Sequence, residues 1–131
     1  MPRTRSSPSP HRTGLVGEAA AEEELVREGY RILARRFRAP GGEADFVAEQ
    51  NGDLVFVEVK CRGSLGAGRP REAVTFTKQK RLMAAARNYC SGAPTDERPI
   101  RFDVVEVLLV FDEVAYVVII PHAFTPFDHD H

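Results

Sequence analysis

The chain of 131 residues has the length of one domain and leaves little room for a second. Its apolar fraction of 43% and charged fraction of 28% are ordinary for a folded globular protein, which argues against both disorder and a membrane protein. The net charge of −1 conceals a segregation of charge along the chain. Residues 41–60 hold five acids against one lysine, and residues 61–90 hold seven basic residues against one acid. The acidic region could bind a metal next to a polyanion that the basic region binds. Alternatively, the charged residues only form a solvated surface.

Both ends of the chain differ in composition from its middle. Residues 1–13 are rich in Ser, Pro and Arg and no apolar signal-peptide core follows them, so we expect a flexible tail. A folded domain is expected over 14–124, followed by a flexible tail over 125–131. Asp128, His129, Asp130 and His131 carry metal-binding groups, but no scaffold surrounds them in the sequence, which favours a free end.

The apolar runs are short, and residues 114–120 form one of the longest. A spanning helix needs about 20 apolar residues, so these runs indicate strands, and we expect a cytoplasmic protein with no membrane partner. Cys61 and Cys90 form no CxxC pair and are expected to be free thiols.

The first half of the chain predicts one helix and three strands. Thr13 as N-cap and Gly29 as a stop predict a helix over 15–29. Asn51 and Gly52 favour a type I′ hairpin turn, because both tolerate the positive φ that it requires. The apolar face of the helix is predicted at Leu15, Ala19, Leu25 and Val26. The strands are predicted over 30–38, 43–50 and 54–62.

The second half predicts another helix and two strands. Thr77 is expected as the N-cap of the helix, whose outer and flanking surface carries Lys80, Arg81 and Arg87. Residues 100–110 and 114–120 are apolar enough to be strands in the middle of a covered sheet. The apolar stripe of the helix is predicted at Leu82, Met83, Ala86, Tyr89 and Cys90.

The two-residue turn at Asn51 and Gly52 fixes the register of the central hairpin, with Gln50 opposite Asp53. One face is then expected to carry three facing pairs: Asp45 and Glu58, Val47 and Phe56, Glu43 and Lys60. The other face is wholly apolar and must pack on a helix. It consists of Ala44, Phe46, Ala48, Val55, Val57 and Val59.

Asp45 and Glu58 are candidate metal ligands. Opposed side chains have Cβ atoms roughly 4.5 to 5.5 Å apart, and two like charges at that separation require a compensating cation or a shifted pKa. Mg²⁺ prefers hard oxygen ligands and keeps several waters. Two carboxylates, a backbone carbonyl and a substrate phosphate would complete its coordination.

Three other charged residues have two interpretations each. Lys60 can orient or help deprotonate an attacking water or steady charge on a phosphoryl group, or it can form a salt bridge with Glu43. Glu18 lies close to the buried stripe of its helix, where a carboxylate needs a partner, and this favours a place in the site. Alternatively, it is an ordinary acid of the first helical turn, which the helix dipole favours. Asp103 pairs with an arginine to hold its strand, or approaches the site from a neighbouring strand. Glu43 has no assigned role.

The order of these acids resembles the active-site layout of the restriction-endonuclease-like superfamily, the PD-(D/E)xK nucleases. Glu18 lies on a predicted helix, Asp45 on one strand and Glu58-x-Lys60 on the next. The superfamily's usual proline before the first metal-binding Asp is Ala44 here. Four segments more closely resemble the bacterial YraN-like family, akin to archaeal Holliday-junction resolvases. They are Gly14-Leu15-Val16-Gly17-Glu18, Gly42-Glu43-Ala44-Asp45-Phe46, Val55-Phe56-Val57-Glu58-Val59-Lys60-Cys61-Arg62 and Arg101-Phe102-Asp103-Val104-Val105, within a resemblance from about Gly14 to Phe124.

The resemblance implies an α/β, restriction-endonuclease-like fold with a central mixed five-stranded sheet flanked by helices. It implies an endonuclease that uses Mg²⁺ or Mn²⁺ to hydrolyse phosphodiester bonds in nucleic acid, DNA rather than RNA, and branched DNA among the candidate substrates. Asp45 and Glu58 would be metal ligands, Lys60 the water-positioning base and Glu18 an additional metal-binding acid of the catalytic set. Junction resolvases of this fold work as two-fold dimers, which implies a homodimer by analogy.

The main alternative is a nucleic-acid-binding module that keeps this fold and cleaves nothing. An intact set of Asp45, Glu58 and Lys60 argues against it, because unmatched charge on a sheet costs stability. A kinase-like activity is excluded by the chain length and by the lack of a Gly-rich nucleotide loop. Under either remaining hypothesis, the phosphate-binding residues would be Arg62, Arg69, Arg71, Lys78, Lys80, Arg81 and Arg87.

Overall fold

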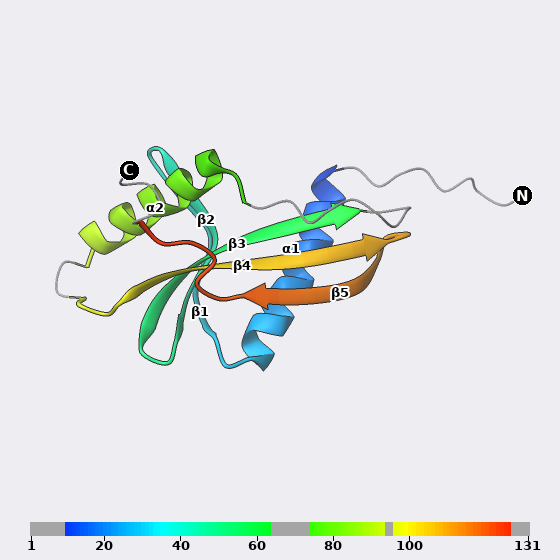
Figure 1. Cartoon of the computed structure of the whole chain (residues 1–131), viewed down its shortest axis with the longest axis horizontal. Coiled ribbons are helices and arrows are strands. Elements are labelled where there is room, and N and C mark those ends of the chain that lie inside the picture. The colour runs from blue at the N-terminus through cyan, green and yellow to red at the C-terminus, as the bar shows by residue number, and fades with distance from the viewer. Residues whose placement is uncertain (1–9, 64–73, 94–95, 127–131) are drawn as a thin grey trace, which may run out of the picture.

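The computed structural model describes residues 10–63, 74–93 and 96–126. They form one sheet with a helix on each face (Figure 1). Neither helix in these ranges is long and apolar enough to cross a membrane. The elements are α1 (Pro10–Arg27), β1 (Arg31–Ala39), β2 (Gly42–Gln50), β3 (Asp53–Gly63), α2 (Phe76–Ser91), β4 (Ile100–Val110) and β5 (Glu113–Ile120).

The five strands lie in chain order across the sheet, from β1 at one edge to β5 at the other. β3 and β4 are parallel and the other neighbours are antiparallel, because α2 carries the chain from the end of β3 back to the start of β4. The predicted mixed five-stranded α/β sheet is therefore confirmed, and it is consistent with a restriction-endonuclease-like fold. The prediction that residues 114–120 lie in the middle of the sheet is wrong, because β5 is an edge strand.

The central hairpin has the predicted turn and the predicted register near that turn. Asn51 has φ 52° and Gly52 φ 84°, as a type I′ turn requires. Gln50 faces Asp53, and Val47 faces Phe56. The register therefore places alternate residues of β3 on opposite faces of the sheet.

One core layer packs α1 against the sheet. Phe46, Val55 and Val57 are buried there with Leu25 of α1. The predicted face of this helix is largely wrong: Leu15, Ala19 and Val26 are exposed, and α1 begins at Pro10, before the predicted cap Thr13. The contact is made instead by the buried small residues Gly17 and Ala21 and by the half-buried Val16 and Ala20.

The reason for that error is the closeness of α1 to β3. A Cβ atom added to Gly17 would lie 2.6 Å from the Sγ atom of Cys61. Small residues permit this approach, but they contribute little to a pattern of apolar spacing.

Neither cysteine forms a disulfide, as the sequence predicted, and Cys61 packs against this core layer.

The second core layer packs α2 against β1, β2 and β3. The N-cap is Thr75, whose Oγ1 accepts a hydrogen bond from the backbone N–H of Lys78 (3.2 Å), so the predicted cap Thr77 lies inside the helix. Gly42 of β2 lies so close that an added Cβ would be 2.4 Å from the backbone nitrogen of Ala85. Of the predicted stripe, Leu82 and Ala86 are buried, and Met83, Tyr89 and Cys90 are half-buried.

A buried polar network joins β4 to the central hairpin. Two guanidinium nitrogens of Arg101 each donate to the carboxylate of Asp103 at 2.9 Å, and Arg101 Nη1 lies 3.0 Å from Asp53 Oδ2. The hydroxyl of Tyr30 donates to Asp103 Oδ2 (2.6 Å), and Arg101 also donates to Gln50 Oε1 (2.6 Å). Asp103 therefore pairs with an arginine to hold its strand, one of its two predicted roles.

The network generates a stability prediction. Asp103→Asn leaves Arg101 buried with one acid partner removed, so we expect the free energy of unfolding to fall by about 3 kcal/mol. Urea unfolding followed by circular dichroism measures this loss. Glu113→Gln, at an exposed position, is the control and should change stability by less than about 0.5 kcal/mol. A loss below about 1 kcal/mol for Asp103→Asn would show that the network does not hold β4.

Candidate active site

The candidate site lies where β2 separates from β3. Their paired residues end at Phe46 and Val57. Beyond this point Oδ2 of Asp45 accepts a hydrogen bond from the backbone N–H of Val59 at 2.6 Å. A side-chain carboxylate thus occupies the position that a strand carbonyl would take. The predicted pairs of Asp45 with Glu58 and of Glu43 with Lys60 fall beyond the regular ladder.

The separation also breaks the alternation of β2. Ala44 packs with Val47 in the core layer under α2, although the two residues are an odd number of positions apart. Ala44 was predicted on the face toward α1, and that prediction is wrong. The irregularity includes Asp45, which bonds to the neighbouring strand. The remaining predicted apolar face is confirmed, because Phe46, Ala48, Val55, Val57 and Val59 pack in the layer that contains α1.

Glu58 is held in an environment that resists its ionisation. Its pKa is raised to about 7, chiefly by burial and then by the negative charge of Asp45, although Lys78 opposes the shift. The side chain of Glu58 is 13% exposed, and Nζ of Lys78 lies 3.5 Å from its Oε1 atom. One lysine therefore compensates only part of the cost of two neighbouring acids.

The pKa of Asp45 is raised for the same main reason, which is burial. The hydrogen bond from Val59 opposes the shift, and the charges of Glu18 and Glu43 add to it. The two acids thus share a deficit of positive charge, as the sequence predicted for two carboxylates brought together.

Glu18 reaches this region from α1. Its charge raises the pKa of Asp45, so the helix brings it close enough to interact electrostatically. Its carboxylate is held by Arg36 of β1, with Nη2 at 2.9 Å and Nε at 3.0 Å from Oε2. Arg36 has φ 51°, which is unusual for a residue other than glycine. Sequence reasoning missed Arg36, because nothing in the run of arginines on this strand distinguishes it from its neighbours.

The first two turns of α2 supply two cations to the same region. Lys78 pairs with Glu58, and Arg81 lies 3.5 Å from Glu43. Glu43, for which the sequence suggested Lys60 as a partner, thus has Arg81 as a cationic partner. The Thr75 cap determines where α2 begins, and the contact with Gly42 determines how closely it approaches β2.

The predicted phosphate-binding residues that the structure describes have different surroundings. Arg69 and Arg71 lie outside the described residues. Lys78 and Arg81 lie at the acids, and Arg62 lies 3.4 Å from Glu106 on β4. Lys80 and Arg87 are exposed on α2, where Lys80 lies over the ring of Phe76 at 6.0 Å.

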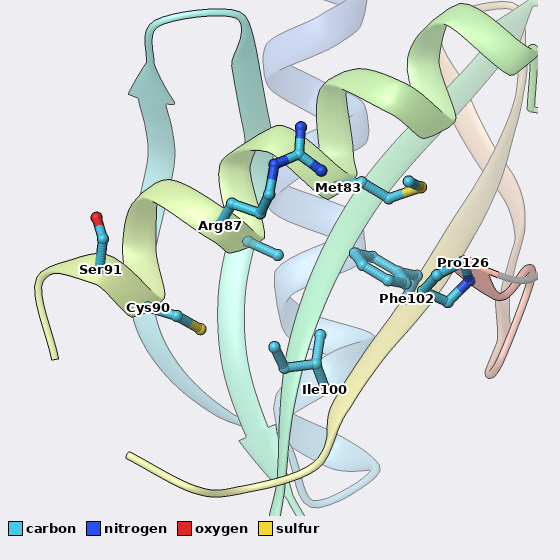
Figure 2. Close-up of a pocket in the computed structure, with 8 residues that line it drawn as sticks. Met83, Arg87, Cys90, Ser91, Ile100, Phe102 and Pro126 are labelled. Atoms are coloured by element: carbon cyan, nitrogen blue, oxygen red, sulfur yellow. The ribbon is translucent and has the colours of Figure 1, made fainter. Parts of the chain in front are cut away.

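A cavity of about 580 Å³ lies away from these acids, between α2 and the start of β4 (Figure 2). Apart from Arg87, Cys90 and Ser91 its lining is apolar, and it contains no carboxylate that could bind a hard cation. It is lined by Met83, Ala86, Arg87, Cys90, Ser91, Ile100, Phe102 and Pro126.

The donor chemistry of the acids suits a hard divalent cation. Within the described residues no group of three or more His, Cys, Asp or Glu side chains has a metal-binding arrangement. Two of the three acids are instead paired with protein cations, Glu18 with Arg36 and Glu58 with Lys78. Carboxylate oxygens are nevertheless ligands that Mg²⁺ prefers. The raised pKa values of Asp45 and Glu58 indicate that the protein neutralises these two acids only in part.

The raised pKa of Glu58 generates a prediction about stability and pH. The unfolded chain loses this proton near the ordinary pKa of 4.5 and the folded protein near 7, so stability falls as the pH rises through that window. Metal-free protein should lose about 1 to 3 kcal/mol between about pH 5 and about pH 8, and Glu58→Gln should lose less. Urea unfolding in EDTA measures both, with Glu23→Gln as the exposed control. Equal losses in all three proteins would contradict the shifted pKa.

Comparison with known proteins identifies the family. Residues 17–107 match the model of the uncharacterised protein family UPF0102. A UPF0102 protein of Symbiobacterium thermophilum is 50% identical over 96 residues, which cover 73% of this chain and 81% of the relative. One from Moorella thermoacetica is 46% identical over 114 residues, covering 86% and 95%, and one from Chlorobium phaeobacteroides is 43% identical over 103 residues, covering 79% and 81%. The chain therefore belongs to the family UPF0102, the YraN-like family that its sequence resembles.

Proposed function

We propose that this protein is a metal-dependent nuclease that hydrolyses phosphodiester bonds in nucleic acid, as the resemblance to the restriction-endonuclease-like superfamily implies. One observation carries the proposal. Asp45 and Glu58 are brought together at a break between two strands, and burial raises the pKa of both. The charge of Asp45 adds to the shift of Glu58, and the charges of Glu18 and Glu43 add to that of Asp45. A fold that keeps two such acids together gives up stability, which is typical of a functional site.

Each residue of the site has a role that its position supports. Asp45 and Glu58, with Glu18 beside them, would hold Mg²⁺ or Mn²⁺ through carboxylate oxygens. Such a cation would act as a Lewis acid that polarises a phosphoryl oxygen. The Val59 N–H fixes the orientation of Asp45 from the other strand. Lys60 follows Glu58 by two residues on β3, where it would orient the attacking water and take part in its deprotonation.

Lys78 has a second role in this proposal. In the metal-free protein it offsets part of the charge of Glu58. Its side chain is 58% exposed, so it can leave that acid without unfolding α2. With Glu58 bound to a divalent cation, the lysine would be available to a phosphate of the substrate. Arg36 would be released from Glu18 for the same reason.

The alternative function is a nucleic-acid-binding module without catalysis, and one observation favours it. Glu18 and Glu58 already have cationic partners within the protein, as expected of acids that serve only structure. The raised pKa of Glu58 argues against this alternative, since Lys78 compensates only part of the repulsion between Glu58 and Asp45. Under either function we expect a cytoplasmic protein that binds DNA in preference to RNA and acts as a homodimer.

A cleavage assay tests the proposal. Purified protein is incubated with labelled linear duplex, single-stranded, flap and four-way-junction DNA, and with RNA, in Mg²⁺, Mn²⁺ or EDTA. We expect cleavage that requires the metal and falls by roughly 100-fold or more in Asp45→Asn and in Lys60→Ala. Glu23→Gln, an exposed acid on the other side of α1 from the core, should cleave like the wild type.

The outcomes separate the two functions. Activity that survives in Asp45→Asn would indicate a contaminating enzyme. Binding that persists in Mg²⁺ without cleavage of any substrate would favour the binding module. The preferred nucleic acid, linear or branched, is the one that the active protein cleaves fastest.

A further inference from the structure

Glu106 is a buried acid in an interior strand of the sheet. It interrupts an otherwise apolar run in β4 and is only 2% exposed. Among the described residues, the other buried charged side chains are Arg101 and Asp103, which neutralise each other. An acid buried between strands costs several kcal/mol unless it is paired, so its partners indicate why it is present.

Two partners come from the neighbouring strands. The hydroxyl of Tyr116 on β5 donates to Oε1 of Glu106 at 2.8 Å. Nη2 of Arg62 on β3 lies 3.4 Å from the same oxygen. The acid thus links three adjacent strands through their side chains.

The position of Glu106 connects this group to the candidate active site. In the parallel register of β3 and β4, Glu106 lies beside Lys60. Arg62 follows Lys60 by two residues, so both side chains project from the same face of β3, about 7 Å apart along the strand. Glu58 precedes them on that face.

This end of the face is not covered by α2. That helix packs on β1, β2 and β3, and the C-terminal ends of β3 and β4 extend past it (Figure 1). The side chain of Arg62 is 22% exposed, whereas that of its partner Glu106 is 2% exposed. The acid is thus buried, and the arginine that it contacts reaches the surface.

We propose that Glu106 is a positioning residue, which holds Arg62 beside Lys60 so that the guanidinium binds a phosphate next to the one attacked. The role rests on the proposed function, because it assumes a polyanionic strand across this face. Tyr116 fixes the orientation of the carboxylate from the other side. A carboxylate that holds one nitrogen of a guanidinium fixes the plane of the group, and a fixed plane suits the paired N–H donors with which arginine binds phosphate oxygens.

The sign of the expected effect distinguishes this role from general electrostatics. Glu106→Gln removes a negative charge, which alone would strengthen the binding of a polyanion. The proposal requires the opposite: affinity for nucleic acid should fall roughly 5- to 10-fold because Arg62 is no longer held. Glu113→Gln, the same substitution at an exposed position on β5, is the matched control and should not weaken binding.

The experiment is a double-mutant cycle on equilibrium binding. Fluorescence anisotropy is measured with labelled duplex DNA in EDTA over a series of salt concentrations, for the wild type, Glu106→Gln, Arg62→Ala and the double variant. We expect both single variants and the double variant to weaken binding to the same extent. Each should also reduce the salt slope of the logarithm of affinity by about 0.9, the value for one phosphate contact.

Thermal unfolding shows whether Glu106→Gln is folded. If it folds poorly, a second variant tests the same role. Tyr116→Phe removes one hydroxyl from a half-buried edge residue and should weaken binding about 2- to 3-fold, an effect that Arg62→Ala abolishes. Additive effects, an unchanged salt slope, or tighter binding by Glu106→Gln would overturn the role. So would a lack of DNA binding by the wild type. Binding with the expected coupling but without cleavage in Mg²⁺ would support the role of Glu106 and overturn only the nuclease.

Discussion

The hydrogen bond from the Val59 N–H to the carboxylate of Asp45 is the interaction on which the arrangement of the candidate site depends. Up to Phe46 and Val57 the central hairpin is a regular ladder. At Asp45 a side chain replaces the backbone acceptor, and the two strands separate.

The two helices border this separation from opposite faces. Gly42 allows α2 to approach β2, and Gly17 allows α1 to approach β3. Glu18 of α1 and Lys78 of α2 consequently reach the acids from either side of the sheet. Glycine at these two positions thus determines which charges meet at the site.

Acids lie at both ends of the central hairpin, and their negative charge is compensated to different degrees. Near its turn, Asp103 receives hydrogen bonds from Arg101 and Tyr30 within a closed network. At the other end, Asp45 and Glu58 share incomplete compensation, and their pKa values are raised. Such a contrast is expected when one group serves stability and the other serves chemistry, because a ligand can stabilise only acids that the protein leaves incompletely neutralised.

The sequence allowed the strands and the pairing of the hairpin to be predicted, because Asn51 and Gly52 fix both the turn and the register. The register of the hairpin was also enough to predict that Asp45 lies near Glu58. The break in the ladder could not be predicted, since a carboxylate bonding to a strand N–H leaves no periodic signal. The same holds for Arg36 and Glu18, which meet only through the packing of α1.

Two other errors have a local cause. Thr75 and Thr77 are both suitable N-caps, and the structure uses the earlier one, which places Lys78 at the third helical position. Gly17 and Ala21, four residues apart, could have indicated a helix face that packs closely, but large apolar residues dominated the pattern. β5 was predicted inside the sheet because its apolar composition resembles that of a central strand.

The most direct test of the site is a crystal structure of the protein grown with Mn²⁺, with data collected for the anomalous signal of manganese. The account predicts an anomalous peak within coordination distance of carboxylate oxygens of both Asp45 and Glu58, with Lys78 displaced from Glu58. Crystals saturated with Mn²⁺ that show no peak at these acids, and that retain the ion pair of Lys78 with Glu58, would contradict it.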